Sequence, residues 1–197
     1  FGRPPRGLWP AEGAVAQQIV PMVADAGFLW MASGEPVLAR SLGLSGFTRD
    51  ARETVEEVDL LYRPYRLSDP QGRPLFIVFR DGVLSDKIGF TYSGMPGEAA
   101  AEDFIRRLEN IREKAREKGV QGPLLVSVIL DGENAWEYYE NDGKAFLHGL
   151  YRRLSESRTI RTVTPSEFLR MFPEAARPLP KLFPGAWFSP NYDTWIG

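Results

Sequence analysis

The chain has 197 residues, 43% of them hydrophobic, and its 24 Lys and Arg residues nearly balance 26 Asp and Glu residues, for a net charge of −2. With no cysteine and one histidine, His148, the composition excludes or strongly disfavours thiol nucleophiles, iron–sulfur clusters and multi-histidine metal centres. The interspersed charges give no basic surface for nucleic acid, and no apolar stretch is long enough to span a membrane. The missing cysteines favour a reducing compartment, so we expect the protein to be cytoplasmic.

In chain order, the first predicted element is a helix over residues 14–26, with apolar side chains at helical spacing and Gly27 as a natural end. Pro21 should kink this helix or mark its first turn. Residues 28–32 and 75–79 are continuous apolar runs, which are typical of buried parallel strands. Between them, over residues 34–65, the pattern is weak.

The second half of the chain predicts further alternation of helices and strands. Helical spacing is clearest over residues 104–115 and returns over 146–154, and a short helix is expected over 165–171. Residues 124–130 read as a third buried strand and 159–163 as a fourth. The Pro-rich, aromatic segment 178–190 is expected to be irregular but ordered.

Strands that alternate with helices and are apolar on both faces predict an α/β fold with a parallel sheet covered by helices. Three or four strands are too few to close a barrel, so we interpret the chain as part of a barrel or of an open sheet. There is no initiator Met, and the chain ends on an apolar, aromatic segment. We therefore expect residues 1–197 to be a single segment of a longer polypeptide, truncated at both ends.

Polar residues that directly follow apolar strands are the first candidates for chemistry, because a parallel sheet presents them to a ligand. Asp131 and Glu133 follow one predicted strand, Arg80 follows another, and Glu12 comes after Trp9 and a proline. Two carboxylates on separate strand ends suit glycoside hydrolysis, in which one attacks or stabilises the anomeric carbon and the other protonates the leaving oxygen.

Sugar sites also need aromatic platforms, and several aromatic residues lie in or just after these polar segments: Trp9, Trp136, Tyr138, Tyr139, Trp187 and Trp195. Plainer interpretations stay open for all these candidates. Glu12 suits the first turn of a helix, Asp131 precedes a glycine as in many turns, and the tryptophans suit ordinary packing. Spacing alone therefore supports only a hypothesis of carbohydrate chemistry.

Three segments in the same order resemble motifs of glycoside hydrolase family 57: LWPAEGAV at residues 8–15, VILDGENAWE at 128–137, and FPGAW at 183–187, leading to WIG at 195–197. FRDGVLSDKIGF at 79–90 is similar to a family segment at the active-site floor, although Gly82 stands where a larger residue, often histidine, is expected. The family contains α-amylases, amylopullulanases, branching enzymes and 4-α-glucanotransferases. The resemblance implies an incomplete seven-stranded (β/α) barrel with parallel strands and outer helices.

The resemblance also implies a retaining mechanism on α-glucans, with α-1,4 and as a second candidate α-1,6 linkages. Glu12 would be the nucleophile and Asp131 the general acid/base. The residues implied to line the sugar subsites are Trp9, Arg80, Asp86, Glu133, Trp136 and Trp187. Neither a metal nor another cofactor is implied. Hydrolysis and transglycosylation stay open, because the choice depends on whether water or a sugar accepts the glycosyl group.

The family's opening motifs, a His-x-Gln-Pro segment and a Gly-Glu segment, do not occur in this sequence. We therefore expect the first barrel strands to come from a missing N-terminal segment of the same parent chain, or the exposed sheet edge to drive self-association. Two other functions have different requirements. A metal-dependent carbohydrate deacetylase needs two histidines and is disfavoured, whereas a non-catalytic carbohydrate-binding or structural half-barrel stays open.

Overall fold

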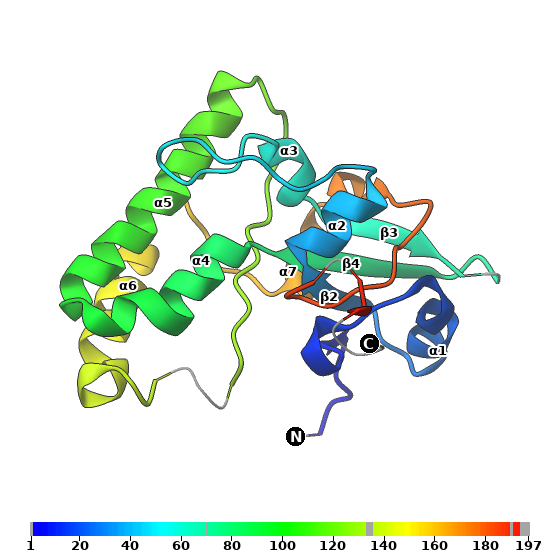
Figure 1. The fold of residues 1–197 in the computed structure, drawn as a ribbon, viewed down its shortest axis with the longest axis horizontal. Coiled ribbons are helices and arrows are strands. Elements are labelled where there is room, and N and C mark those ends of the chain that lie inside the picture. Colours follow the sequence, from blue (N-terminus) through cyan, green and yellow to red (C-terminus); the bar gives the residue numbers. More distant parts are fainter. Residues whose placement is uncertain (1, 70, 133–135, 190, 194–197) are drawn as a thin grey trace.

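A computed structural model describes residues 2–69, 71–132, 136–189 and 191–193 as a mixed α/β fold around one five-stranded sheet (Figure 1). The strands are β1 (Gly7–Leu8), β2 (Trp30–Gly34), β3 (Tyr65–Ser68), β4 (Pro74–Arg80) and β5 (Arg177–Pro178), in the order β1-β2-β4-β3-β5. The β1–β2, β2–β4 and β3–β5 pairs are parallel, and the β3–β4 pair is antiparallel. The sheet is therefore mostly parallel, as the apolar runs predict.

The α-helices are α1 (Val20–Asp25), α2 (Glu35–Ser41), α3 (Val58–Leu61), α4 (Gly82–Asp86), α5 (Gly97–Glu117), α6 (Lys144–Glu156) and α7 (Pro165–Met171). Shorter helical turns are η1 (Ala11–Gly13), η2 (Gln17–Ile19), η3 (Lys87–Thr91), η4 (Tyr92–Gly94), η5 (Glu140–Gly143) and η6 (Pro173–Ala175). Helices α5 and α6 pack side by side beside the sheet, and α4 lies between them and β4 (Figure 1).

The two faces of the sheet bury different clusters, because successive side chains of a strand point to opposite faces. Met31 and Ile77 face the main core, which extends to α5 and α6. Ala32 and Val78 face a smaller cluster that includes Phe168 of α7. Arg80 has the same parity as Val78, so the alternation along β4 carries its side chain to the face of the smaller cluster.

The long helices and the two central strands confirm the periodicity arguments. Strand β4 contains the apolar run 75–79, β2 overlaps the run 28–32 from Trp30 onward, α5 and α6 contain the helical repeats, and α7 has the predicted bounds. Thr164 caps α7 by accepting a hydrogen bond from the backbone N–H of Glu167, whose side chain accepts one from the backbone of Thr164. The predicted helix over residues 14–26 is shorter, and Pro21 lies in the first turn of α1.

Residues 124–130 do not form the predicted regular strand. Strand β3 pairs with β4 only over residues 74–77, so residues 78–80 leave a short free edge, which the segment reaches only at Arg80. The segment instead runs extended past the end of β4, with a single parallel bridge between Ser127 and Arg80. Its course still follows the sheet, because the N–H of Asp81 donates to the carbonyl of Ser127 at 2.9 Å.

The predicted strand over residues 159–163 is also wrong, because this segment is an exposed or half-buried connection without strand pairing. Strand β3 was not predicted and adds an antiparallel neighbour to the expected parallel sheet. Its alternation of buried Tyr65 and Leu67 with exposed Arg66 and Ser68 is the signal of a one-sided strand, within a region where the helical pattern was weak.

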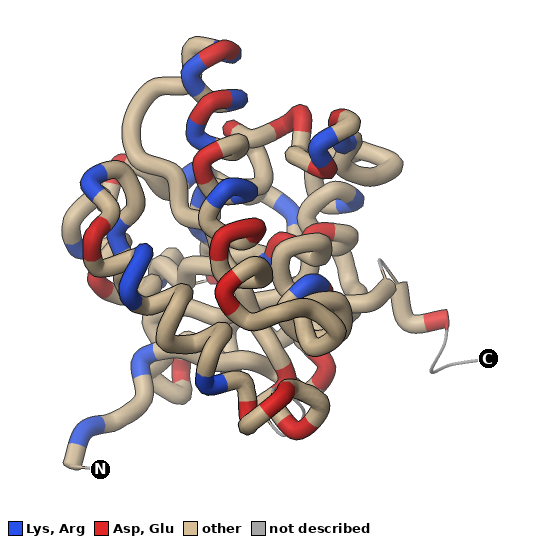
Figure 2. The backbone as a smooth tube through the Cα atoms, turned by 90° about the vertical axis from the view of Figure 1, so that its left-hand side faces the viewer, with Lys and Arg blue, Asp and Glu red and all other residues tan. Residues whose placement is uncertain are grey.

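No helix in the described part of the chain is long and apolar enough to cross a membrane. On the face drawn in Figure 2, Lys and Arg residues alternate with Asp and Glu residues along the helices. This matches the near balance of charges in the sequence.

The contact between η4 and α5 makes stability depend on pH. The hydroxyl of Tyr92 donates to Asp103 Oδ2 at 2.6 Å, and Arg107 Nε donates to the same oxygen at 2.7 Å. Burial opposes ionisation, but these bonds and one from Arg106 outweigh it and lower the pKa of Asp103 to about 2. The carboxylate is therefore more stable in the folded than in the unfolded chain.

We predict that the free energy of unfolding loses about 1 kcal/mol from Asp103 as pH falls from about 4 to about 2, and that Asp103→Asn removes this part of the slope. Above pH 4 the contribution is fully present, because both folded and unfolded chains are then ionised. Urea unfolding at a series of pH values measures the slope. Glu102→Gln, which alters an exposed acid of the same helix, is the control and should keep the wild-type profile.

Candidate active site

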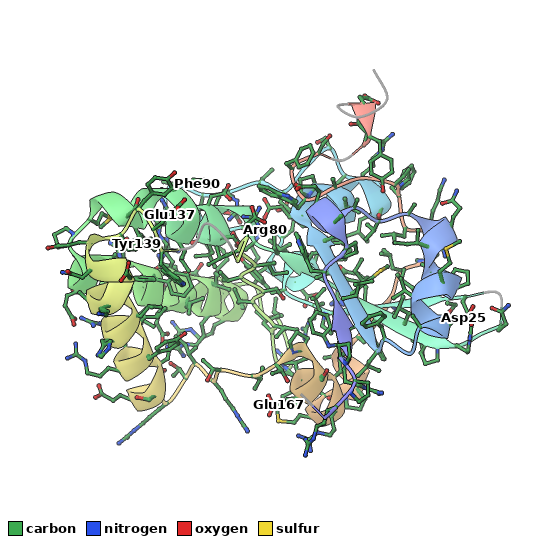
Figure 3. All side chains as sticks on the ribbon, turned by 90° about the horizontal axis from the view of Figure 1, so that it is seen from below. Asp25, Arg80, Phe90, Glu137, Tyr139 and Glu167 are labelled. Atoms are coloured by element: carbon green, nitrogen blue, oxygen red, sulfur yellow. The ribbon has the colours of Figure 1, made fainter. Side chains whose placement is uncertain are left out.

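A cleft lies where α4 and η3 meet the sheet face that buries the smaller cluster. Its volume, including its opening to solvent, is about 440 Å³. Its lining residues are Trp9, Arg80, Ser85, Gly89, Phe90, Ile129, Leu130, Asp131 and Trp187. Four of the predicted site residues, from segments far apart in the sequence, thus share one cleft. Figure 3 shows Arg80 between the sheet and the helices, on the same side of the molecule as Phe90.

Arg80, the last residue of β4, forms the buried floor of this cleft and is only 6% exposed. Its Nη2 lies 2.6 Å from Asp86 Oδ1, and its Nε donates to the carbonyl of Ile129 at 3.2 Å. Its guanidinium also lies over the ring of Trp187, 4.5 Å from the centroid. These contacts fix a positive charge against an aromatic wall, and the attraction of the cation to the ring stabilises the arrangement.

Glu12 lies beside the cleft in η1, with its carboxylate held by Trp187. The indole Nε1 donates to Glu12 Oε2 at 2.9 Å, and the backbone N–H of Trp187 donates to the carbonyl of Glu12 at 3.0 Å. A nucleophilic carboxylate is stabilised by hydrogen bonds or by a nearby cation, for which Arg80 is the candidate. The structure supplies the hydrogen bond directly, and Arg80 lies over the face of the same indole.

The backbone of Glu12 is in the left-handed region, with φ 53° and ψ 25°. A side chain with a Cβ is strained there, and such strain is concentrated at functional sites. The next residue, Gly13, also has a positive φ of 56°, and its carbonyl accepts a hydrogen bond from Ser33 Oγ of β2 at 2.7 Å. The turn that presents Glu12 is thus tied to the neighbouring strand.

Gly34, at the end of β2, lets the Trp187 segment approach. A Cβ at Gly34 would lie 2.4 Å from the carbonyl oxygen and 2.6 Å from the Cα of Trp187, so no larger residue fits without a backbone shift. The contact seats the C-terminal segment on the end of the central strand. The requirement for glycine here was not recognised from the sequence, because the segment that demands it lies about 150 residues further along the chain.

Asp131 reaches the cleft from the extended segment that passes the end of β4. Ser85 of α4 accepts a hydrogen bond from the N–H of Ile129 at 3.2 Å, which holds this segment two residues before the carboxylate. The Asp131 residue is exposed.

The other predicted subsite residues have different positions. Asp86 is half-exposed and contacts Arg80 without lining the cleft. Trp136 is not among the lining residues and packs on Tyr139 and Phe146, with ring centroids 5.5 and 6.2 Å away. Glu133 and Trp195 lie outside the described residues.

Behind the cleft, Arg49 joins two carboxylates that directly follow the central strands, a contact that sequence reasoning missed. Its Nη2 lies 2.7 Å from Glu35 Oε2 and 3.2 Å from Asp81 Oδ1. Asp81 also accepts hydrogen bonds from the Tyr62 hydroxyl at 2.5 Å and the Leu84 N–H at 2.9 Å, and Glu35 accepts one from the Gly82 N–H at 2.9 Å. We call Glu35, Arg49, Tyr62 and Asp81 the Arg49 cluster.

Burial dominates the electrostatics of the Arg49 cluster. It raises the pKa of Glu35, while the charge of Arg49 opposes that rise. Burial and the neighbouring Asp81 raise the pKa of Tyr62 well above its ordinary value. The phenol therefore stays protonated and donates a hydrogen bond to the Asp81 carboxylate. The one visible sequence signal was an acidic residue directly after each strand. Nothing in the sequence indicated Arg49 as their shared partner.

No group of three or more Asp, Glu or His residues in the described ranges is arranged to hold a metal ion. The cleft itself offers one buried cation, carboxylates at its edge and aromatic walls. Such a set of groups can bind a polyhydroxylated, uncharged ligand and exchange protons with it.

A cleft at the strand ends of a mostly parallel α/β sheet is the arrangement of an open α/β sheet or of part of a (β/α) barrel. A family model, glycosyl hydrolase family 57, matches residues 1–180. The chain therefore belongs to glycosyl hydrolase family 57, as its sequence motifs predict. A search of the curated proteins gave no match to the chain.

Solved structures share the fold at low sequence identity. A 4-α-glucanotransferase from Thermococcus litoralis is 20% identical with a TM-score of 0.63, covering 93% of this chain and 25% of that one. The α-amylase AmyC from Thermotoga maritima is 16% identical with a TM-score of 0.68, covering 95% of this chain and 44% of that one. A branching enzyme from Pyrococcus horikoshii is 15% identical with a TM-score of 0.63, covering 91% and 37%. The chain thus spans from a quarter to less than half the length of these proteins.

The left-handed backbone at Glu12 leads to a test of strain. Glu12→Gly and Glu12→Ala both remove the carboxylate and its bond to Trp187, but only glycine adopts a positive φ without steric cost. We therefore predict that Glu12→Gly has a free energy of unfolding about 1 kcal/mol larger than that of Glu12→Ala. Urea unfolding of the two variants measures the difference. If the alanine variant is as stable as the glycine variant, the backbone at residue 12 is not strained.

Proposed function

We propose that this chain forms part of a retaining glycoside hydrolase or transglycosylase that acts on α-glucans, with Glu12 as the nucleophile and Asp131 as the general acid/base. One observation carries the proposal. Asp131 lines the same cleft as Arg80, Trp9 and Trp187, and the Trp187 indole holds the carboxylate of Glu12 at 2.9 Å. Family membership supports the reaction class, and the sequence motifs around both carboxylates support their separate roles.

In the first step of the proposed reaction, a carboxylate oxygen of Glu12 attacks the anomeric carbon. The bond from that carbon to the leaving oxygen breaks, and Asp131 gives its proton to the leaving sugar. The hydrogen bond from Trp187 orients the Glu12 carboxylate, and Arg80 stabilises negative charge in the cleft.

In the second step, Asp131 takes a proton from an incoming hydroxyl group, whose oxygen attacks the anomeric carbon and displaces Glu12. Water as the acceptor gives hydrolysis, and a sugar hydroxyl gives transglycosylation. The described cleft is open to solvent. The proposal accordingly names the reaction class and leaves the acceptor to experiment. The proposed substrates are α-1,4 linkages, with α-1,6 linkages as a second candidate.

The test uses nearly isosteric variants of the full-length protein that contains this chain. We predict that Glu12→Gln and Asp131→Asn each lower the turnover of an α-1,4-glucan by about 10³-fold or more, with little change in thermal stability. Release of reducing ends measures hydrolysis, and formation of new oligosaccharides measures transglycosylation. Wild-type activity in Glu12→Gln would exclude it as the nucleophile.

Azide separates the two roles. Asp131→Ala, acting on a substrate with an activated leaving group, can still form the glycosyl-enzyme, so azide should restore part of its turnover. Glu12→Gln forms no such intermediate and should not respond. The alternative function, a non-catalytic carbohydrate-binding or structural half-barrel, requires that the wild-type protein bind the glucan without turning it over in either assay.

We also propose that the sheet is completed by further strands, from the parent chain or from a second copy. Both edges of the described sheet, β1 and β5, are strands of two residues, paired on one side only. We predict that residues 1–197, expressed alone, self-associate in size-exclusion chromatography. Such self-association should disappear when the complete parent protein is used. A monodisperse, stable monomer of residues 1–197 would show that this sheet needs no further strands.

A further inference from the structure

Phe90 is an exposed aromatic residue on the wall of the cleft that no catalytic role uses. It is 71% exposed, although it stands between Ile88 and Tyr92, which are both buried. It lines the cleft together with Ser85 and Gly89, from α4 and η3, whereas Trp9 and Trp187 line it from the two ends of the chain. Figure 3 shows Phe90 at the outer edge of the helical layer, on the side of Arg80.

The backbone that carries Phe90 is firmly anchored. The carbonyl of Ile88 accepts a hydrogen bond from the Tyr139 hydroxyl at 2.5 Å, and the carbonyl of Phe90 accepts one from Ser93 Oγ at 3.1 Å. Tyr92 is held by Asp103 of α5. The segment η3 is a turn of π-helix, a rare conformation that is common at functional sites. The ring is thus presented to solvent from a fixed support.

The space in front of Phe90 is open. The ring is 71% exposed, and a Cβ added at the neighbouring Gly89 would meet no atom within 4 Å, so the backbone beside Phe90 also faces open space. An exposed apolar ring beside polar groups is typical of a ligand-binding groove. The apolar C–H face of a glucosyl ring fits such a surface, while its hydroxyl groups stay in contact with water and with polar groups of the cleft.

We propose that Phe90 is a stacking platform for one glucosyl unit of the substrate, in the cleft that Trp187 also lines. This inference rests on the proposed function, because it assumes an α-glucan in the cleft. Phe90 contributes affinity and takes no part in the chemistry. It adds a second aromatic wall, from η3, to the wall that the tryptophans form.

The test is calorimetric titration of maltohexaose into the full-length protein with Glu12→Gln as the background, so that binding is measured without turnover. Phe90→Ala should weaken the affinity about tenfold, since it removes one aromatic contact. Phe90→Trp keeps a stacking surface and should bind within about threefold of the background. Tyr151→Ala removes an equally exposed aromatic ring, 63% exposed on α6, and should leave the affinity unchanged.

Equal affinity of the background and Phe90→Ala would overturn the inference and leave the proposed function standing. Failure of Phe90→Trp to retain binding, with an unchanged melting temperature, would also overturn it. If the Glu12→Gln background and the wild type neither bind maltohexaose nor turn it over, the proposed function fails and the inference fails with it. The turnover of the wild type thus separates the two failures.

Discussion

The site depends on the ion pairs by which Arg49 holds two buried carboxylates at the ends of the central strands. Glu35 follows β2 and Asp81 follows β4, so the guanidinium joins the strands where they stop pairing. Two buried carboxylates side by side would repel each other, and the shared cation makes both tolerable. The residues just before them, Gly34 and Arg80, are the ones that contact Trp187. The Arg49 cluster thereby fixes the positions of Gly34 and Arg80, on which Trp187 packs.

Trp187 is the point at which the separate parts of the cleft meet. Its indole N–H holds Glu12, its ring carries Arg80, and its backbone rests on Gly34. The same arginine binds Asp86 and the carbonyl of Ile129, two residues before Asp131. The Glu12 carboxylate is therefore linked, through one aromatic ring and one cation, to the backbone of the segment that carries Asp131.

Local patterns were enough to predict the parts of this protein whose structure is set locally. The apolar runs of β2 and β4, the repeats of α5 and α6, and the bounds of α7 follow from periodicity and capping. Residues 124–130 have the composition of a strand, but strand pairing depends on the length of free edge available, and the segment meets β4 only at Arg80. Trp9, Arg80, Asp131 and Trp187 lie in recognisable motifs, so the sequence indicated them as site residues. Arg49 lies in no such motif, and its contact with two strand ends is visible only in three dimensions.

The bond between Glu12 and Trp187 joins residues that are 175 positions apart. Val15 pairs with Gly185, and the hydroxyl of Tyr192 donates to the carbonyl of Val15 at 2.6 Å, so several contacts close the same long loop. During synthesis, the strained turn at Glu12 leaves the ribosome long before the residues that support it. The central strands and α5 can fold earlier, but the cleft cannot be assembled until the last segment has emerged. Assembly of the site therefore follows synthesis of the central strands, and it reports that the segment around Trp187 has been made.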